Sequence, residues 1–260
     1  MFNTRGDKKE PGDKCKQGHP RRKDRNAYRF SRPNIPMNQT LAILVVATLA
    51  FITRLYNVHK PAHVCWDETH FGKMASWYIN RTFFFDVHPP LGKMLIAFSG
   101  YLSGYDGSFA FDKPGDEYEH WTQYVGMRVF CAILGLSIPV MIYQATRIMT
   151  RSSQSALMAS LLIVFDNGMI TLTRYILLDP PLLFFISTSI LGMAQFSFSN
   201  LQEATKSFTI NWWCWLIFTG TSIACAFSVK FVGLFIVALI GLRTIYDLWM
   251  ILGDTAREIS

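Results

Sequence analysis

The sequence carries little charge for its length. Only 17% of its 260 residues are Asp, Glu, Lys or Arg, half are apolar, and the mean hydropathy is +0.21. Soluble domains carry about 25% charged residues, so this composition argues against a soluble domain. It favours a protein whose surface largely faces lipid.

Cysteine is also sparse, and its pattern points to no sulfur chemistry. The five cysteines form no CxxC pair, and three of them fall in apolar runs, so we predict packing roles for them. No cluster of His, Cys, Asp and Glu has metal-ligand spacing, and a lone histidine in a loop is more often a hydrogen-bonding group. We therefore predict no required metal and no cofactor.

The first 32 residues have few aliphatic side chains. They are rich in Lys, Arg, Asp and Gly, so they cannot bury enough apolar surface to offset ordering entropy, and we predict a disordered tail over residues 1–32. They lack the apolar region and cleavage site of a signal peptide, so we expect no cleavage. Because many basic residues lie in this tail, the net charge of +7 indicates membrane topology rather than a nucleic-acid partner.

Long uncharged runs follow the tail. A bilayer core about 30 Å thick needs roughly 20 apolar residues in a helix, so residues 33–251 predict an all-α polytopic membrane protein with about six transmembrane helices. Asp166 interrupts the third run. Arg243 and Asp247 interrupt the sixth, where a spacing of four lets them pair. The expected spans are residues 36–55, 126–147, 153–173, 180–199, 209–229 and 231–251.

The basic residues predict how the helices are oriented. The positive-inside rule places the tail, the loop with Arg147 and Arg151, and the end at residues 252–260 in the cytosol. Residues 57–122 then form a luminal loop. Aromatic and apolar residues at helical spacing near residues 71–78, and an apolar patch at 91–101 after two prolines, predict interfacial helices there. A short transmembrane hairpin arm is the alternative for the second patch.

Two adjacent carboxylates, Asp67 and Glu68, lie in this luminal loop. Ionisable residues that gather at one membrane face are functional candidates, because such residues are costly in lipid. Adjacent residues point to different faces of a helix or strand, so the two are not a dyad that shares a proton. We predict that one acts as a general base and the other positions it or binds the acceptor. A solvated loop pair is the alternative for an isolated Asp-Glu.

Cations occur at the same predicted face. Arg128 begins the second span, Lys230 stands between the fifth and sixth, and Lys93 lies in the loop. A planar guanidinium together with an ammonium group suits a phosphate, although any one such residue alone is more often a snorkelling interface residue. The remaining candidate substrate-binding residues on the predicted luminal side are His88, Arg174 and Asp179.

The motifs occur in the order Asp67-Glu68, VHPPLGK, Met127-Arg128, LLDPP and VKFVGLF. As a set they resemble the protein O-mannosyltransferases of the endoplasmic reticulum, most closely the second subfamily. The resemblance covers about residues 38–250. It implies the N-terminal half of a C-type glycosyltransferase fold, dolichyl-phosphate mannose as the donor, Ser or Thr of secretory proteins as the acceptor, and inversion at the anomeric carbon.

The resemblance also assigns roles. It implies that Asp67 is the catalytic carboxylate, that Glu68 is its motif partner, and that Arg128 and Lys230 contact the donor phosphate. It further implies a multi-pass protein of the endoplasmic reticulum membrane that pairs with a subunit of the first subfamily, protein O-mannosyltransferase 1. Family members continue with about five more spans and a luminal MIR domain, which this sequence lacks.

Three other functions are compatible with some of these features. Another lipid-linked sugar transferase of the same fold would also carry a luminal acidic motif. A truncated, non-catalytic subunit would pair with a full-length mannosyltransferase through its helices. A transporter is the third alternative, but transporters place their charges near the bilayer midplane, whereas these lie at the predicted luminal ends.

Overall fold

The computed structural model describes residues 38–119, 124–202 and 208–253, and over these residues it contains helices and no strand. The predicted tail at residues 1–32 and most of the predicted end at 252–260 lie outside the described residues. The helices are α1 (Gln39–Leu55), α2 (Glu68–Ile79), α3 (Leu91–Leu102), α4 (Val125–Thr150), α5 (Ser153–Phe165), α6 (Asn167–Leu172), α7 (Asp179–Gln202), α8 (Ile210–Val229), the short 3-10 helix η3 (Phe231–Gly233) and α9 (Leu234–Leu252).

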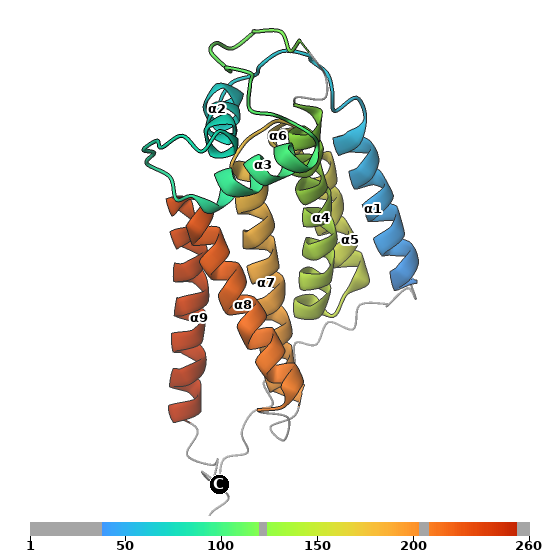
Figure 1. The fold of residues 1–260 in the computed structure, drawn as a ribbon. Coiled ribbons are helices and arrows are strands. Elements are labelled where there is room, and N and C mark those ends of the chain that lie inside the picture. The colour runs from blue at the N-terminus through green and yellow to red at the C-terminus, as the bar shows by residue number, and fades with distance from the viewer. Residues whose placement is uncertain (1–37, 120–123, 203–207, 254–260) are drawn as a thin grey trace, which may run out of the picture. The chain divides into compact units, whose positions relative to one another are not determined.

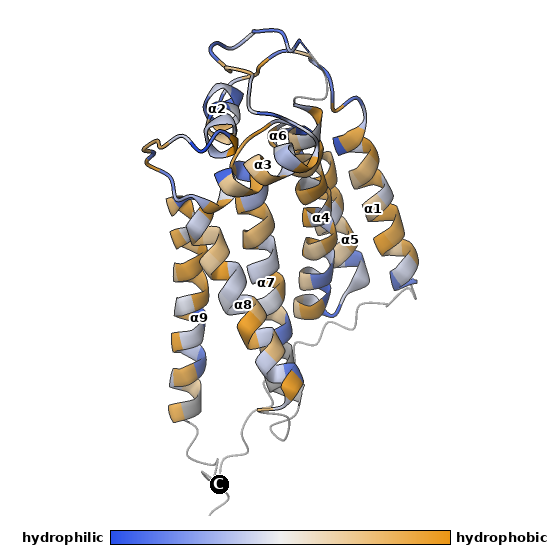
Figure 2. Cartoon of the chain, viewed as in Figure 1, coloured by the Kyte–Doolittle hydropathy of each residue, from blue (hydrophilic) through white to orange (hydrophobic). Residues whose placement is uncertain are grey.

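Several helices have the length and composition of membrane spans. Hydrophobic residues occupy much of their length, as Figure 2 shows for α1, α4, α5 and α9. Four helices within the described residues are long and apolar enough to cross a membrane: Val125–Thr150, Asp179–Ser197, Ile210–Val229 and Phe231–Met250. Helix α1, with 17 residues, and α5, with 13, are apolar but shorter, so the count of about six spans stays a prediction.

The region expected as one span at 153–173 forms two helices, α5 and α6, which meet at Asp166. Asp166 has an extended backbone, with φ −67° and ψ 117°, and its Oδ1 accepts a 2.6 Å hydrogen bond from the Met169 amide. An Asp side chain that caps the following helix in this way competes with continuation of the preceding helix. The buried Arg54 of α1 donates to the carbonyls of Ile163 and Val164, which lie at the end of α5.

The long helices lie side by side, and the short ones gather at one end of them (Figure 1). Both helices expected in the 57–122 loop are present as α2 and α3, and α3 follows Pro90 as expected. Helix α3 has 12 residues and lies across the ends of the long helices rather than alongside them, an orientation that fits an interfacial helix better than an arm of a transmembrane hairpin. The α6–α7 and α8–α9 connections reach the same end, and the expected Arg243–Asp247 pair forms at 3.0 Å.

A hydrophobic core fixes the loop onto this end of the helices. Buried apolar side chains from the loop pack with side chains from α2, α3, α4, α7, α8 and the α6–α7 connection, and this packing leaves the intervening backbone little freedom. The loop residues next to the carboxylates are therefore held by a close-packed core. Representative members of the core are Val64, Phe71, Ile96, Phe111, Tyr118, Met127, Leu178 and Val229.

Candidate active site

Glu68 and Arg128 form a buried ion pair where the loop meets the helices. Both side chains are 0% exposed. Arg128 Nε donates to Glu68 Oε1 at 2.8 Å, and Nη2 donates to Oε2 at 2.7 Å. This two-bond geometry is the strongest arrangement between a guanidinium and a carboxylate. Residues in the first turns of α2 and α4 are thereby locked together.

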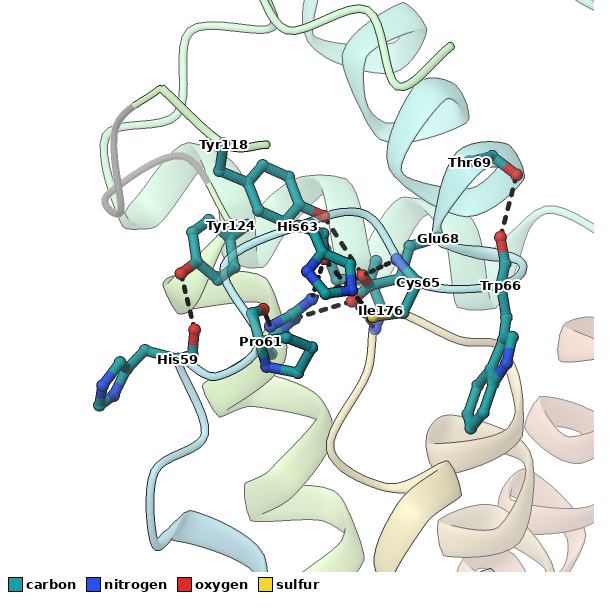
Figure 3. A network of polar contacts seen from close by, with 11 residues as sticks. His59, Pro61, His63, Cys65, Trp66, Glu68, Thr69, Tyr118, Tyr124 and Ile176 are labelled. Atoms are coloured by element: carbon teal, nitrogen blue, oxygen red, sulfur yellow. Dashed lines mark hydrogen bonds and ion pairs between the residues drawn. The ribbon is translucent and has the colours of Figure 1, made fainter. Parts of the chain in front are cut away.

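The Glu68 carboxylate is also hydrogen-bonded by three further groups. It accepts from the Cys65 amide at 2.8 Å, the Ile176 amide at 3.0 Å and the Tyr118 hydroxyl at 3.3 Å (Figure 3). Burying two charges is costly unless such bonds satisfy them. Burial and the adjacent carboxylate of Glu68 raise the pKa of Tyr118, so this hydroxyl keeps its proton and remains a donor.

Arg128 uses its remaining hydrogen bonds to hold the loop backbone. Its guanidinium donates to the carbonyls of Pro61 at 2.7 Å and His63 at 3.0 Å. Aromatic rings surround it, which favours a desolvated guanidinium. Arg128 therefore fixes the chain that leads directly into the carboxylates. The rings and their centroid distances from Arg128 Cζ are Tyr118 at 5.5 Å, Tyr124 at 4.7 Å and Tyr175 at 5.1 Å.

Asp67 has the opposite environment from its neighbour. It is exposed, it directly precedes α2, and its side chain makes no capping hydrogen bond. Within the described part of the chain, no hydrogen bond or ion pair involves its carboxylate. The side chains of successive residues point in different directions at the start of a helix, so the burial of the Glu68 side chain leaves the Asp67 side chain directed away from the core. An accessible, unpaired carboxylate has the properties that a general base needs.

Lys230 and Asp179, which are distant in sequence, meet at the same end of the helices. Lys230 is the extended residue between α8 and η3, and Asp179 begins α7. Their Nζ and Oδ1 atoms are 3.3 Å apart, with side chains 24% and 30% exposed. The ammonium group is therefore partly accessible, unlike the guanidinium of Arg128.

Lys93 is occupied within its own loop. Its buried ammonium group donates to Asp86 and, at 2.8 Å, to the carbonyl of His88. Burial alone would raise the pKa of Asp86, but the hydrogen bond and charge of Lys93 outweigh it and lower that pKa below its ordinary value. The pair secures the loop before α3. His88 Nδ1 is buried and has no hydrogen-bond partner among the residues that the structure describes.

Arg174 ties the α6–α7 connection to the end of α1. Its Nη2 donates to the carbonyls of Tyr56 at 2.8 Å and Asn57 at 3.0 Å. Together with Lys60 it lines a cleft of about 680 Å³, so two cations face one opening. The other lining residues are Pro61, Ala62, Asn167, Ile170, Thr171 and Tyr175.

The structure thus brings six of the eight candidate residues of the sequence into three contacts. Glu68 pairs with Arg128, Lys230 pairs with Asp179, and Lys93 donates to the carbonyl of His88. Asp67 is exposed, and Arg174 holds the end of α1. The sequence did not point to the three tyrosines around Arg128, because no spacing rule connects them. Among the residues that the structure describes, no three His, Cys, Asp or Glu side chains are close enough to hold a metal ion.

Known proteins are similar to this chain in sequence. The family profile of dolichyl-phosphate-mannose-protein mannosyltransferase matches residues 44–260. Protein O-mannosyl-transferase 2 of Drosophila melanogaster is 54% identical over 222 residues, which are 85% of this chain and 29% of the relative. The protein of the same name from Danio rerio is 54% identical over 84% of this chain and 28% of the relative.

The fold is shared as well. A Saccharomyces cerevisiae protein O-mannosyltransferase, solved in the Pmt1-Pmt2 complex bound to the sugar donor, matches with a TM-score of 0.80 and 36% identity. The match covers 86% of this chain and 30% of the solved one, so this chain spans less than a third of the length of these relatives. The profile and the relatives show that the chain belongs to the dolichyl-phosphate-mannose-protein mannosyltransferase family.

Proposed function

We propose that this chain is the part of a protein O-mannosyltransferase that holds the catalytic carboxylate. The enzyme transfers mannose from dolichyl-phosphate mannose to Ser or Thr hydroxyls of secretory proteins with inversion. The observation that carries the proposal is the exposed, unpaired Asp67 beside a buried frame built by Glu68 and Arg128. The names of the relatives and the sugar donor in the solved complex support it.

The proposed reaction needs one base and stabilisation of one leaving group. Asp67 accepts the hydroxyl proton while the acceptor oxygen bonds to the anomeric carbon and the bond from that carbon to the phosphate oxygen breaks. A positioned base contributes about 10²–10⁴-fold. Dolichyl phosphate leaves as an anion, so it needs positive charge rather than a general acid.

The geometry distributes the cations between two roles. The guanidinium of Arg128 is buried and engaged with Glu68 and two backbone carbonyls. We therefore assign it a positioning role, in place of the phosphate contact that the sequence suggested. Lys230 is partly exposed, and we assign it to the donor phosphate. Asp179 orients its ammonium group, and Arg174 lies at the neighbouring cleft.

The partner and the location belong to the same proposal. The solved relative belongs to a complex of two subunits, which supports a heterodimer with a subunit of the protein O-mannosyltransferase 1 type. The apolar helices and the relatives support a multi-pass protein of the endoplasmic reticulum membrane, and the basic tail with Arg147 and Arg151 supports a cytosolic position for these segments. The end that carries Asp67 then faces the lumen.

The test is Asp67→Asn in the complete protein that contains this sequence, assayed with dolichyl-phosphate mannose and a Ser/Thr peptide. The amide keeps the shape of the carboxylate but cannot take the proton, so the rate should fall on the order of 10²-fold or more with unchanged expression. Asp112→Asn is the matched control, because Asp112 is an exposed loop carboxylate paired with Lys73. A normal rate in Asp67→Asn would make Asp67 structural and remove the basis of the proposal.

The same assay addresses the non-catalytic alternative. The 260-residue chain alone should insert into membranes without transferring mannose, because charges such as Arg174 and Lys230 lie at helix ends that later helices are expected to cover. Turnover by the purified chain without a partner would show that the remaining helices are dispensable.

A further inference from the structure

Trp66, the residue before Asp67, has an environment that neither packing nor the proposed mechanism explains. Trp66 is 57% exposed, and several other aromatic residues of the loop are exposed as well, whereas Phe71, Phe111 and Tyr118 are packed into the core. Its backbone lies in the left-handed region, with φ +43°. That conformation is unfavourable for a bulky residue and is typically retained where it orients a functional group.

The position of the indole is fixed by its neighbours. The Trp66 carbonyl accepts hydrogen bonds from the Thr69 hydroxyl at 3.1 Å and the Thr69 amide at 3.4 Å. The ring packs against Tyr175 in an edge-to-face arrangement, with centroids 5.2 Å apart and planes at 71°. Tyr175 lies in turn against Arg128. The indole is therefore anchored on one side and open on the other.

The indole also points out of the polar network. Figure 3 shows the Trp66 ring directed away from the residues around Glu68. It contributes nothing to the buried ion pair, and yet its Cα is only about 3.8 Å from that of the proposed base, as for any adjacent residues. Aromatic side chains together with a few placed polar groups commonly line ligand sites.

A hexose is a suitable ligand for such a ring. The faces of a pyranose present axial C–H bonds, which pack on an aromatic face while the hydroxyl groups remain at the rim. We infer that Trp66 is the stacking platform for the mannosyl ring of the donor, and that it holds the anomeric carbon near Asp67. This inference rests on the proposed function and adds a sugar-contacting residue to it.

The test compares binding of dolichyl-phosphate mannose with binding of sugar-free dolichyl phosphate to the complete protein. Trp66→Leu keeps an apolar side chain but removes the aromatic face, so it should weaken binding of the mannose-bearing donor roughly three- to tenfold. Binding of dolichyl phosphate should not change. Trp66→Phe retains a ring and should bind the donor nearly as well as the parent protein. Trp66→Met is a second ringless variant in case Trp66→Leu does not fold.

The matched control is Trp213→Leu, which removes a 47% exposed tryptophan from α8 and should leave both ligands bound normally. Equal weakening of both ligands in Trp66→Leu and Trp66→Met would identify Trp66 as a membrane-interface anchor and overturn the inference. Unchanged donor binding in these variants would also overturn it.

A failure of the inference can be separated from a failure of the proposed function. Asp67→Asn should bind the donor normally while losing transfer, because it keeps the platform. If the parent protein neither binds the donor nor transfers mannose, the proposed function is wrong. If the parent protein transfers mannose and Trp66→Leu still binds the donor normally, only the platform is wrong.

Discussion

At the scale of single residues, the adjacent carboxylates of Asp67 and Glu68 have opposite environments. Glu68 is buried and accepts hydrogen bonds from Arg128, two backbone amides and Tyr118, whereas Asp67 is exposed and unpaired within the described residues. A carboxylate with every lone pair engaged is a poor base but a strong structural link. We expect changes at the two positions to separate stability from catalysis.

The first prediction concerns Glu68→Gln. The amide cannot compensate the charge of Arg128, and an uncompensated buried charge costs about 3–5 kcal/mol. The unfolding midpoint of the detergent-solubilised protein should fall, whereas Asp67→Asn should leave it unchanged. The double variant Glu68→Gln/Arg128→Met should recover part of the loss, because it removes the charge. An unchanged midpoint in Glu68→Gln would show that the pair does not support the loop.

The second prediction concerns Lys230→Ala. If Lys230 holds the donor phosphate and the bound donor buries this contact, loss of its ammonium group should weaken donor use by about 2–5 kcal/mol and leave the apparent affinity for the acceptor peptide nearly unchanged. Steady-state rates with each substrate varied in turn measure the two effects. Lys113→Ala is the control, because Lys113 is an exposed loop lysine. Equal effects on donor and acceptor would contradict the assignment.

At the scale of elements, small residues set how closely the helices approach. Gly192 of α7 faces α8, and a Cβ atom at this position would lie 2.5 Å from Thr219 Oγ1 and 3.3 Å from Thr219 Cα. Gly220, one residue further along α8, has no heavy atom within 4 Å of the equivalent position. Close helix packing through small residues is typical of membrane bundles.

These two glycines provide a matched prediction. Gly192→Ala should push α7 and α8 apart and lower the free energy of unfolding by about 1–3 kcal/mol. Gly220→Ala should be neutral or stabilising by up to about 1 kcal/mol, because alanine is the better helix former. Thermal unfolding of both variants measures the difference. Equal effects would mean that the α7–α8 contact does not depend on Gly192.

At the scale of the whole chain, the polar loops collect at one end of the helices. The connections after α1, before α4, between α6 and α7, and after α8 all reach the end where α2 and α3 lie (Figure 1). Arg147 lies in the last turn of α4 and Arg151 directly follows this helix, at the other end of the bundle. Asp67, Glu68 and Lys230 are therefore on the same side of the bundle.

This arrangement predicts opposite accessibility for the two ends in membranes. Lys113→Cys, in the exposed loop after α3, should react with a membrane-impermeant thiol reagent only from the luminal side. Thr150→Cys, at the exposed end of α4, should react only from the cytosol. Sealed microsomes, intact and then permeabilised, make the comparison. Cytosolic labelling of Lys113→Cys would reverse the proposed topology.

The sequence by itself determined the fold class and the family. Long uncharged runs specify membrane helices because lipid leaves the backbone no other partner for its hydrogen bonds, and the ordered motifs around Asp67 and Lys230 are specific to one family. The two helices of the 57–122 loop were also predictable, since apolar residues at helical spacing and a proline start mark them.

Only the tertiary structure decided what each charged residue contacts. Sequence spacing does not predict that Glu68 meets Arg128, because this contact depends on how the loop packs onto the helices, or that Lys93 is already engaged by Asp86, because that contact depends on how the chain turns before α3. The break at Asp166 depended on a local competition between capping α6 and continuing α5. The exposure of Trp66 and its left-handed backbone position are likewise three-dimensional properties that hydrophobic pattern alone does not encode.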